Sequence, residues 1–335
     1  MSVKLQFNGS EQVSDKIFAL PAAEFAKDVV EGLTATEKYL SSKYFYDERG
    51  DELFQQIMAL ESYYLTRAEF QIFENQSASI IEVLKERQGS FQLLEFGAGD
   101  GTKTKVLLRA FLEAGLDFRY CPIDISDNVL KGLTDSLHHE LPDLKVEGLH
   151  GDYFQVLDAL NRQSDERKVI LFLGSNIGNF SYEKAQDFLG AMSTNLHTED
   201  LLLIGIDIKK DPKVILNAYD DPEGVTAQFN LNLLSRINNE LDADFELDNF
   251  QHYASYNPQN GECRSYLMSK CKQQVRLGAL DMTVDFKAWE EIHMEISKKY
   301  SLEEIGRLAE SSGFSVKKQL LDDQQFFVDS FWEVR

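Results

Sequence analysis

The segment FQLLEFGAGDGTKT, residues 91–104, constrains the fold of this chain more than any other feature. A short apolar run ends there in a glycine-rich turn, and the helical pattern KVLLRAFLEAG follows at once. A strand, a glycine loop and a helix in this order are typical of α/β domains that bind a nucleotide-like ligand at the turn. Because Gly97 and Gly99 lack Cβ atoms, the backbone amides of the turn can approach such a ligand. The turn alone does not identify the cofactor class, since dinucleotide enzymes use similar turns.

The alternation of strands and helices continues beyond the turn. Further strand patterns with helical patterns between them are FRYCPID (118–124), KVEGLHGDYF (145–154), KVILFLGSNIGNF (168–180) and LLLIGIDI (201–208). This alternation predicts a parallel sheet with helices on both faces, and Ser126 is the expected N-cap of one helix. After the helical pattern 301–313, two strand patterns stand too close for a crossover helix, so they should pair antiparallel. The predicted fold class is therefore α/β, a Rossmann-like sheet with a C-terminal antiparallel hairpin.

The chain is long enough for more than one substructure. Its 335 residues exceed what a single hydrophobic core usually supports. Apolar residues have helical spacing in the N-terminal part, and a later interruption of the α/β pattern combines helical patterns with two strand patterns around the turn PQNG. We expect residues 89–210 and 301–335 to form the cofactor-binding domain, and residues 1–88 and 211–300 to form a discontinuous α+β region that binds the substrate.

Two acidic residues follow the strands next to the glycine turn. Asp124 ends the second strand pattern, where a carboxylate can accept hydrogen bonds from both ribose hydroxyls. Asp152 follows the third strand pattern and could accept the adenine amino group; each residue could instead cap a strand or the next helix. Thr102 stands where the third glycine of the dehydrogenase motif G-x-G-x-x-G belongs. Together with the C-terminal hairpin, this favours S-adenosylmethionine over a nicotinamide cofactor.

The composition excludes several classes of partner. The formal net charge of -22 repels phosphate backbones and anionic membranes, so we expect no nucleic acid or membrane partner. The three cysteines lack CxxC spacing and the six histidines lack metal-ligand spacing, which favours a cytoplasmic location and no metal. The opening residues MSVKLQFNGSEQVSDKIF contain no apolar segment of signal-peptide length, so we expect no export. The sequence does not determine the oligomeric state, and a monomer is consistent with it.

Several motifs together resemble a known family, the histidine-specific Nα-methyltransferases of ergothioneine biosynthesis. The similar segments, in order and spacing, are FYDERGDELFQQI, ESYYLTRAE, LLEFGAGDGTKT, CPIDIS, FLGSNIGNF, AYDDPEGVTAQFN and MEISKKY. The resemblance runs through most of the chain, and several motifs in order are more specific than one glycine loop. It implies a methyltransferase that uses S-adenosylmethionine and acts on a small-molecule substrate, an amino acid.

The resemblance also implies roles for individual residues. Tyr63 and Tyr219 would hold the substrate carboxylate, and Asn179 would orient the α-amino nitrogen toward the sulfonium methyl group. Glu295 and Ser297 would contact the imidazole ring. The other implied residues are Tyr46 near the amine, where its ring can also stabilise the growing ammonium, Gly174, Phe229 and Ser265 around the substrate, and Gly97, Gly99, Lys103, Asp124 and Asp152 at the cofactor.

These residue types suit the chemistry of methyl transfer. The reaction is an in-line displacement, so the enzyme supplies proximity and alignment and must bind a neutral amine, because a protonated amine has no lone pair. The Glu295 carboxylate could accept a hydrogen bond from a ring N–H, and Ser297 could serve the other ring nitrogen. Their spacing puts both side chains on the same side only in an extended segment. Taken alone, Glu295 also has the character of an ordinary surface carboxylate, whereas Asn179 follows a glycine at the end of an apolar strand pattern.

One departure from the family leaves the substrate open. Arg264 and Ser265, in ECRSYLMSK, stand where we expect an acidic residue and a methionine beside the substrate ring. The leading hypothesis is methylation of the α-amino group of L-histidine, up to the trimethylated betaine, with S-adenosylhomocysteine as the second product and a pocket between the α/β domain and the insertion. The alternatives are methylation of another amino acid or small amine, a nicotinamide-dependent dehydrogenase, and a non-catalytic nucleotide-binding module.

Overall fold

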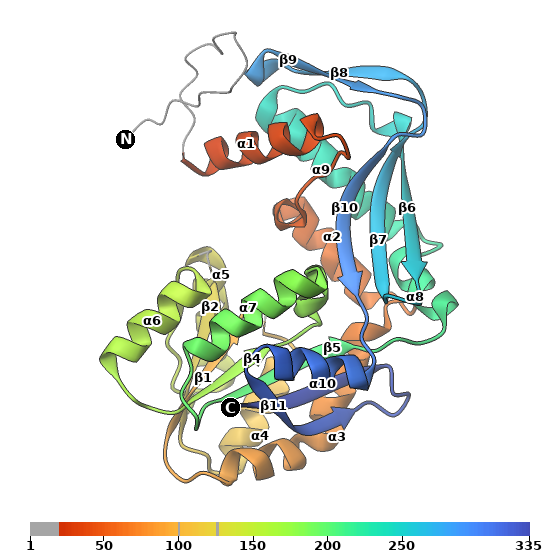
Figure 1. Ribbon diagram of the computed structural model, residues 1–335. Coiled ribbons are helices and arrows are strands. Elements are labelled where there is room, and N and C mark those ends of the chain that lie inside the picture. The colour runs from red at the N-terminus through yellow and green to blue at the C-terminus, as the bar shows by residue number, and fades with distance from the viewer. Residues whose placement is uncertain (1–19, 100, 125–126) are drawn as a thin grey trace. The chain divides into compact units, whose positions relative to one another are not determined.

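The computed structural model describes residues 20–99, 101–124 and 127–335, so the expected N-cap Ser126 lies outside the described residues. The chain divides into two compact units, each made of two segments. Unit 1 comprises the residues up to Tyr64 and the segment Asp211–Ser297, and unit 2 comprises Leu65–Lys210 and Lys298–Arg335. Most helices and strands of both units are labelled in Figure 1.

Unit 2 is built on a seven-stranded sheet with the order β11-β12-β5-β4-β1-β2-β3. Its strands are β1 (Phe91–Phe96), β2 (Phe118–Asp124), β3 (Leu149–His150), β4 (Lys168–Phe172), β5 (Leu201–Asp207), β11 (Phe314–Leu321) and β12 (Phe327–Val334). β1 pairs in parallel with β2 and β4, whereas β12 runs antiparallel to β5 and β11. All residues of β1, β4 and β5 are buried, as expected for apolar strands that are covered on both faces. The predicted α/β fold and its C-terminal hairpin are confirmed.

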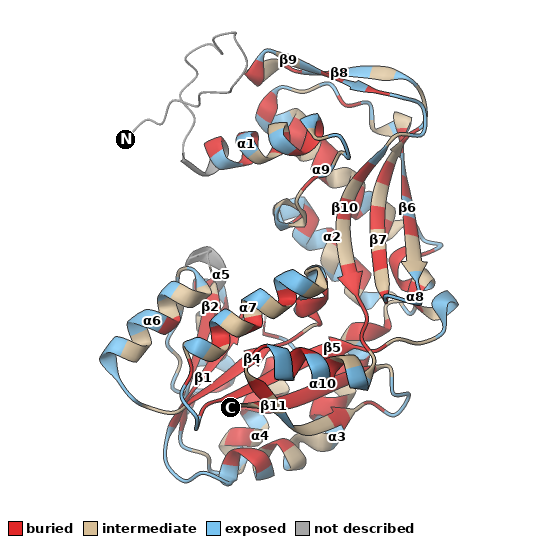
Figure 2. Ribbon diagram, viewed as in Figure 1, coloured by how far each residue is buried: buried red, intermediate tan, exposed pale blue. Residues whose placement is uncertain are grey.

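Helices cover both faces of this sheet. They are α3 (Tyr64–Lys85), α4 (Thr104–Glu113), α5 (Asp127–Glu140), α6 (Tyr153–Gln163), α7 (Tyr182–Thr194) and α10 (Leu302–Ser311), with the 3-10 helix η2 (Asn176–Asn179). One core contains residues of α3, α4 and α5, and a second core contains residues of α6, α7 and α10. Leu93 of β1 lies in the first core and Leu94 in the second, because successive side chains of a strand point to opposite faces. Figure 2 shows the buried strands between the two helical layers.

Helix α3 is grouped with unit 2, which differs from the expected boundary at residue 88. Its residues Ile72, Phe73 and Ile80 lie in the same core as Leu93 of β1. The spacing of apolar residues predicts the helix but does not identify the surface against which it packs. The contact with β1 therefore moves the boundary to Tyr64.

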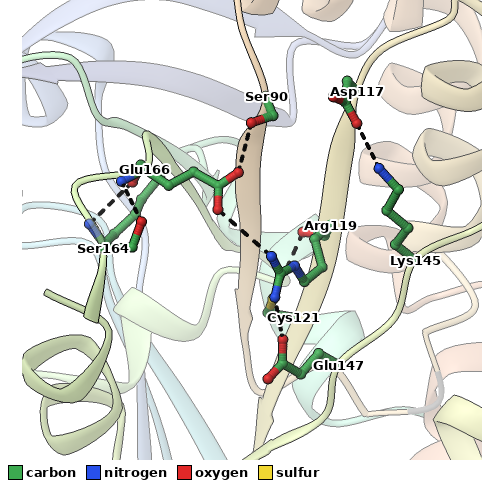
Figure 3. A network of polar contacts seen from close by, with 9 residues as sticks. Ser90, Asp117, Arg119, Cys121, Lys145, Glu147, Ser164 and Glu166 are labelled. Atoms are coloured by element: carbon green, nitrogen blue, oxygen red, sulfur yellow. Dashed lines mark hydrogen bonds and ion pairs between the residues drawn. The ribbon is translucent and has the colours of Figure 1, made fainter. Parts of the chain in front are cut away.

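A polar network joins β1 and β2 near their amino ends (Figure 3). The guanidinium of Arg119 on β2 lies 2.8 Å from a carboxylate oxygen of Glu147 and 4.0 Å from one of Glu166. Glu166 also accepts a hydrogen bond of 2.9 Å from the hydroxyl of Ser90, which directly precedes β1. Partly exposed pairs of this kind contribute little stability. They lie at the strand ends opposite to the glycine turn, which follows the carboxyl end of β1.

Unit 1 combines helices with two small sheets. Its helices are α1 (Leu20–Thr34), α2 (Glu48–Ala59), α8 (Pro212–Tyr219) and α9 (Val225–Leu241), with the 3-10 helices η1 (Ser42–Tyr44), η3 (Leu247–Asn249) and η4 (Gly278–Leu280). Its strands are β6 (Phe250–Asn257), β7 (Glu262–Ser269), β8 (Gln273–Leu277), β9 (Met282–Phe286) and β10 (Glu291–Lys298), in the orders β10-β7-β6 and β8-β9. β6 and β7 pair antiparallel around the turn PQNG, as predicted. No helix within the described ranges is both long enough and apolar enough to cross a membrane.

Candidate active site

The glycine turn lies at the carboxyl end of β1, next to the ends of β2 and β4. Gly97 and Gly99 have φ angles of 70° and 54°, a backbone conformation that favours glycine. A Cβ atom at Gly97 would lie only 3.1 Å from the hydroxyl oxygen of Tyr153. The turn therefore leaves a space that a side chain would fill. It lies at the edge of the sheet where α/β proteins bind their ligands.

The two acidic residues differ in what they contact. Asp124 is the last residue of β2, half-buried, and opposite His150 of β3 in parallel register. Asp152 is the N-cap of α6, where its Oδ1 accepts hydrogen bonds from the backbone N–H groups of Phe154 at 3.0 Å and Gln155 at 3.3 Å. Asp152 thus has the capping contacts that the sequence left as an alternative, while its contact with adenine stays a prediction.

Tyr153 is a residue of this region that the sequence analysis did not select. Its ring stacks on Phe96 of β1, with ring centroids 4.4 Å apart and planes at 10°. Burial, followed by the negative charges of Asp124 and Asp152, raises the pKa of Tyr153 to about 12, so the phenol is protonated at neutral pH. The signal in the sequence is an aromatic residue directly after the acidic one in GDYF.

The segment after β4 carries two asparagines. β4 ends at Phe172, and Asn179 is the last residue of the 3-10 helix η2. The sequence had suggested instead that Asn179 stands at the end of a strand. Asn179 is exposed. Asn176, which the sequence analysis did not select, has its Nδ2 4.0 Å from the Cβ position of both Gly97 and Gly174. Asn176 therefore borders the glycine turn and the loop after β4.

The Lys103 side chain and Gly174 lie close together near these loops. Gly174 has a φ angle of 71°, and a Cβ atom there would lie 3.4 Å from the Lys103 ammonium. This ammonium forms an ion pair with Glu69 of α3, and the backbone N–H of Gly174 donates a 2.7 Å hydrogen bond to the same carboxylate. Burial acts to lower the pKa of Lys103, but Glu69 outweighs burial, so the pKa is raised and the lysine is charged. Gly174 thus lies beside a predicted cofactor residue in unit 2.

Five aromatic rings form a continuous cluster in unit 1. Tyr46 lies 5.5 Å from Phe54 and 5.8 Å from Phe229, measured between ring centroids. Phe54 contacts Tyr63 at 6.5 Å, and Tyr63 contacts Tyr219 at 6.3 Å with an interplanar angle of 64°. Phe229 is buried, whereas the Tyr46 side chain is 46% exposed. The structure therefore brings four predicted substrate residues together, through Phe54 of α2, which the sequence analysis did not select.

The hydroxyl groups of Tyr219 and Ser297 lie 2.8 Å apart and form a buried hydrogen bond. The carbonyl oxygen of Tyr219 is also 2.9 Å from Nε2 of His252, and burial lowers the pKa of this histidine. A neutral His252 can donate its Nε2–H to the carbonyl, which fixes the end of α8. Glu295 lies with Ser297 on strand β10, so the extended segment that their shared role requires is present.

The positions that depart from the family lie on β7. Ser265 is buried and opposite Ala254 of β6. Arg264 has the opposite side-chain direction in the strand, and its guanidinium is 2.9 Å from a carboxylate oxygen of Glu262. Across the described part of the chain, no group of three or more His, Cys, Asp and Glu side chains is arranged to hold a metal ion.

Comparison with known proteins identifies the family. Residues 25–334 match the family described as histidine-specific methyltransferase, SAM-dependent. The chain belongs to this family. The predicted enzyme class, an S-adenosylmethionine-dependent methyltransferase, is thereby confirmed, as is the family resemblance.

Relatives of this methyltransferase align with most of its length. A histidine N-alpha-methyltransferase of Mycobacterium tuberculosis is 39% identical over 86% of this chain and 88% of that protein. A histidine N-alpha-methyltransferase of Mycolicibacterium smegmatis is 39% identical over 87% of this chain and 89% of that protein. Ergothioneine biosynthesis protein 1 of Schizosaccharomyces pombe is 32% identical over 83% of this chain and 36% of that protein.

Proposed function

We propose that this enzyme transfers methyl groups from S-adenosylmethionine to the α-amino nitrogen of L-histidine, up to the trimethylated betaine, and releases S-adenosylhomocysteine. The observation that carries the proposal is the match to the histidine-specific family over residues 25–334. It is supported by the 39% identity to proteins named histidine N-alpha-methyltransferase. The buried Tyr219–Ser297 pair adds a local reason, because it joins a proposed carboxylate ligand to a proposed ring ligand.

The residues around the glycine turn fit an adenosine-containing cofactor. Gly97 and Gly99 have positive φ angles, and Tyr153 lies close to Gly97. The turn therefore presents backbone atoms to a ligand in place of side chains. We assign the ribose hydroxyls to Asp124, because a carboxylate offers two acceptor oxygens at the end of β2. Asp152 is assigned to the adenine amino group. Lys103 completes the proposed cofactor set, and S-adenosylmethionine, when bound, supplies an electrophilic methyl group on a cationic sulfur.

The residues of unit 1 suit the two ends of histidine. Tyr63 and Tyr219 are assigned to the substrate carboxylate, since a phenol O–H donates a hydrogen bond to an anion. Ser297 and Glu295 are assigned to the imidazole, with the carboxylate accepting from a ring N–H. Phe229 and Ser265 are assigned to the surroundings of the substrate, and Gly174 of unit 2 is assigned there as well.

The methyl transfer itself needs alignment more than acid–base chemistry. The amide oxygen of Asn179 is assigned to accept a hydrogen bond from the substrate amine, which directs the nitrogen lone pair toward the methyl group. Each transfer places positive charge on the nitrogen, and the ring of Tyr46 can stabilise that charge by a cation–π contact. Each proton released before the next transfer goes to solvent.

A second candidate is methylation of another amino acid or small amine. The observation in its favour is the Arg264–Ser265 pair on β7, where we expect an acidic residue and a methionine.

Mass spectrometry of the products separates these candidates. The purified full-length protein is incubated with S-adenosylmethionine and each of the twenty amino acids. We expect a product three methyl groups heavier than the substrate from histidine alone. Methylation of a different amino acid would keep the reaction class and transfer the substrate assignment to that compound, whereas absence of any methylated product would contradict the proposed function.

A further inference from the structure

Glu69 of α3 is a charged residue in the interior of unit 2. Its side chain is fully buried, with 0% exposure, and a carboxylate is rarely buried unless strong partners stabilise it. One oxygen accepts the backbone N–H of Gly174 at 2.7 Å, and the other pairs with the Lys103 ammonium. Gly174 follows β4 and Lys103 follows the glycine turn after β1. A single carboxylate therefore connects the loops at the carboxyl ends of two adjacent parallel strands.

The neighbouring strands leave space for the Glu69 carboxylate. A Cβ atom at Gly205 of β5 would lie 2.3 Å from the Glu69 oxygen, so only glycine leaves space for the carboxylate. Asp329 of β12 is also fully buried, and among the described residues neither of its carboxyl oxygens has a hydrogen-bond partner. Burial, followed by the charge of Glu69, raises the pKa of Asp329 well above its ordinary value, against the effect of Lys103. Lys103, Glu69 and a neutral Asp329 together carry no net charge, which reduces the cost of burying them.

We propose that Glu69 is a positioning residue for the cofactor, which holds the Lys103 ammonium and the Gly174 loop in the geometry that binds S-adenosylmethionine. The inference rests on the proposed function, in which Lys103 is a cofactor ligand. A lysine side chain has a flexible four-carbon stem, and fixing it before the ligand arrives reduces the entropy lost on binding. The Gly174 contact fixes the start of the loop that continues into η2, where Asn176 borders the glycine turn.

The variant Glu69→Gln tests this role. The glutamine amide oxygen can still accept the Gly174 N–H, but no carboxylate remains opposite Lys103. We expect the affinity for S-adenosylhomocysteine, measured by calorimetry on the full-length protein, to fall by about tenfold or more, as for loss of a hydrogen bond to a charged group. The KM for the amino acid should change far less. The matched control is Glu74→Gln, an exposed position on the same helix, which should bind like the original protein.

A double-mutant cycle with Asp329→Asn tests the same role a second time, with binding measured on the folded protein of each variant. Because Asp329 is neutral while Glu69 is present, Asp329→Asn alone should weaken binding less than Glu69→Gln. In the Glu69→Gln background Asp329 can ionise opposite Lys103, so Asp329→Asn should then cost clearly more than it does alone. Additive effects of the two substitutions would contradict the inference that Lys103 depends on a carboxylate partner to bind the cofactor.

The outcomes separate this inference from the proposed function. If the original protein bound neither S-adenosylmethionine nor S-adenosylhomocysteine, the proposed function would fail. If the original protein bound both and folded Glu69→Gln bound them equally well, the positioning role would be wrong while the function stood. A lower melting temperature with unchanged affinity of the folded fraction would also overturn the positioning role, because Glu69 would then act on stability alone.

Discussion

At the residue scale, the hydroxyl of Tyr219 offers a direct test of the substrate side. It forms a buried 2.8 Å hydrogen bond with Ser297, and its ring contacts Tyr63. Tyr219→Phe keeps the ring but removes the hydroxyl from the proposed carboxylate and leaves Ser297 without this partner. We expect the KM for histidine to rise by about tenfold, because a hydrogen bond to a charged group is lost, while the affinity for S-adenosylhomocysteine stays unchanged.

Steady-state kinetics with varied histidine, together with calorimetry of the cofactor product, measure both quantities. Tyr253→Phe is the matched control, because Tyr253 is 52% exposed on β6 of the same unit. An unchanged KM for histidine in Tyr219→Phe would remove Tyr219 from the substrate site.

Single residues also mark the limit of prediction from the sequence. Tyr219 and Ser297 could be selected because they lie in motifs that resemble the family, and they are in contact. Glu69 could not be selected, since one carboxylate in a helix normally indicates a solvent-facing position. Its burial depends on Lys103 and Gly174, which are 34 and 105 residues away along the chain. Such partners have no local signal in the sequence.

At the scale of elements, the cap of α10 is a testable source of stability. Ser301 accepts a hydrogen bond from the Glu304 backbone N–H, and the Glu304 side chain accepts one from the Ser301 backbone N–H. The pattern of a serine followed three residues later by a glutamate predicts this capping box. We expect Ser301→Ala to lower the free energy of unfolding by about 1 kcal/mol. Chemical denaturation measures this, and Ser77→Ala within α3 should show no comparable loss, because alanine favours a helix interior.

The elements with strong periodicity are the ones that the sequence predicts well. β1, β4 and β5 are buried throughout and mainly apolar, and the patterns indicate them directly. β3 contains only two residues, too few for any period to be visible. The 3-10 helix that ends at Asn179 has only four residues. It packs so closely that a Cβ atom at Gly178 would lie 2.8 Å from the carbonyl oxygen of Lys298. These short elements are set by tertiary contacts, so local patterns do not define them.

At the scale of the whole molecule, unit 2 consists of two chain segments, and both points where the chain crosses between the units are fixed to its sheet. The chain leaves it after Lys210 and returns at Lys298. Asp207, at the end of β5, forms ion pairs with Lys210 and, at 2.7 Å, with Lys299. Burial acts to raise the pKa of Asp207, but the two lysines outweigh burial and lower it, so the carboxylate is charged. Both crossings are thereby attached to one strand of the sheet.

The stability of unit 2 should also depend on pH through Glu95 of β1. Its buried carboxylate accepts hydrogen bonds from the hydroxyls of Thr104, at 2.6 Å, and Tyr120. Burial raises the pKa of Glu95 from 4.5 to about 7, against the lowering effect of both hydroxyls. The folded state therefore retains a proton that the unfolded chain releases between these pH values. The stabilising contribution of this proton is complete below the pKa of Glu95 in the unfolded chain, and it is lost as the pH rises through the pKa of Glu95 in the folded protein.

The variant Glu95→Gln resembles the protonated acid at every pH, and either hydroxyl can rotate to accept from its amide. The variant should therefore gain stability relative to the original protein as the pH rises from about 5 to 8, by on the order of 3 kcal/mol for the shift in pKa. Melting temperatures of both proteins across this range measure the difference. Glu113→Gln on the exposed side of α4 should show no such increase. A difference for Glu95→Gln that stayed constant with pH would mean that Glu95 is ionised in the folded protein throughout, and that its hydroxyl partners and the nearby Lys103 outweigh the cost of burying its charge.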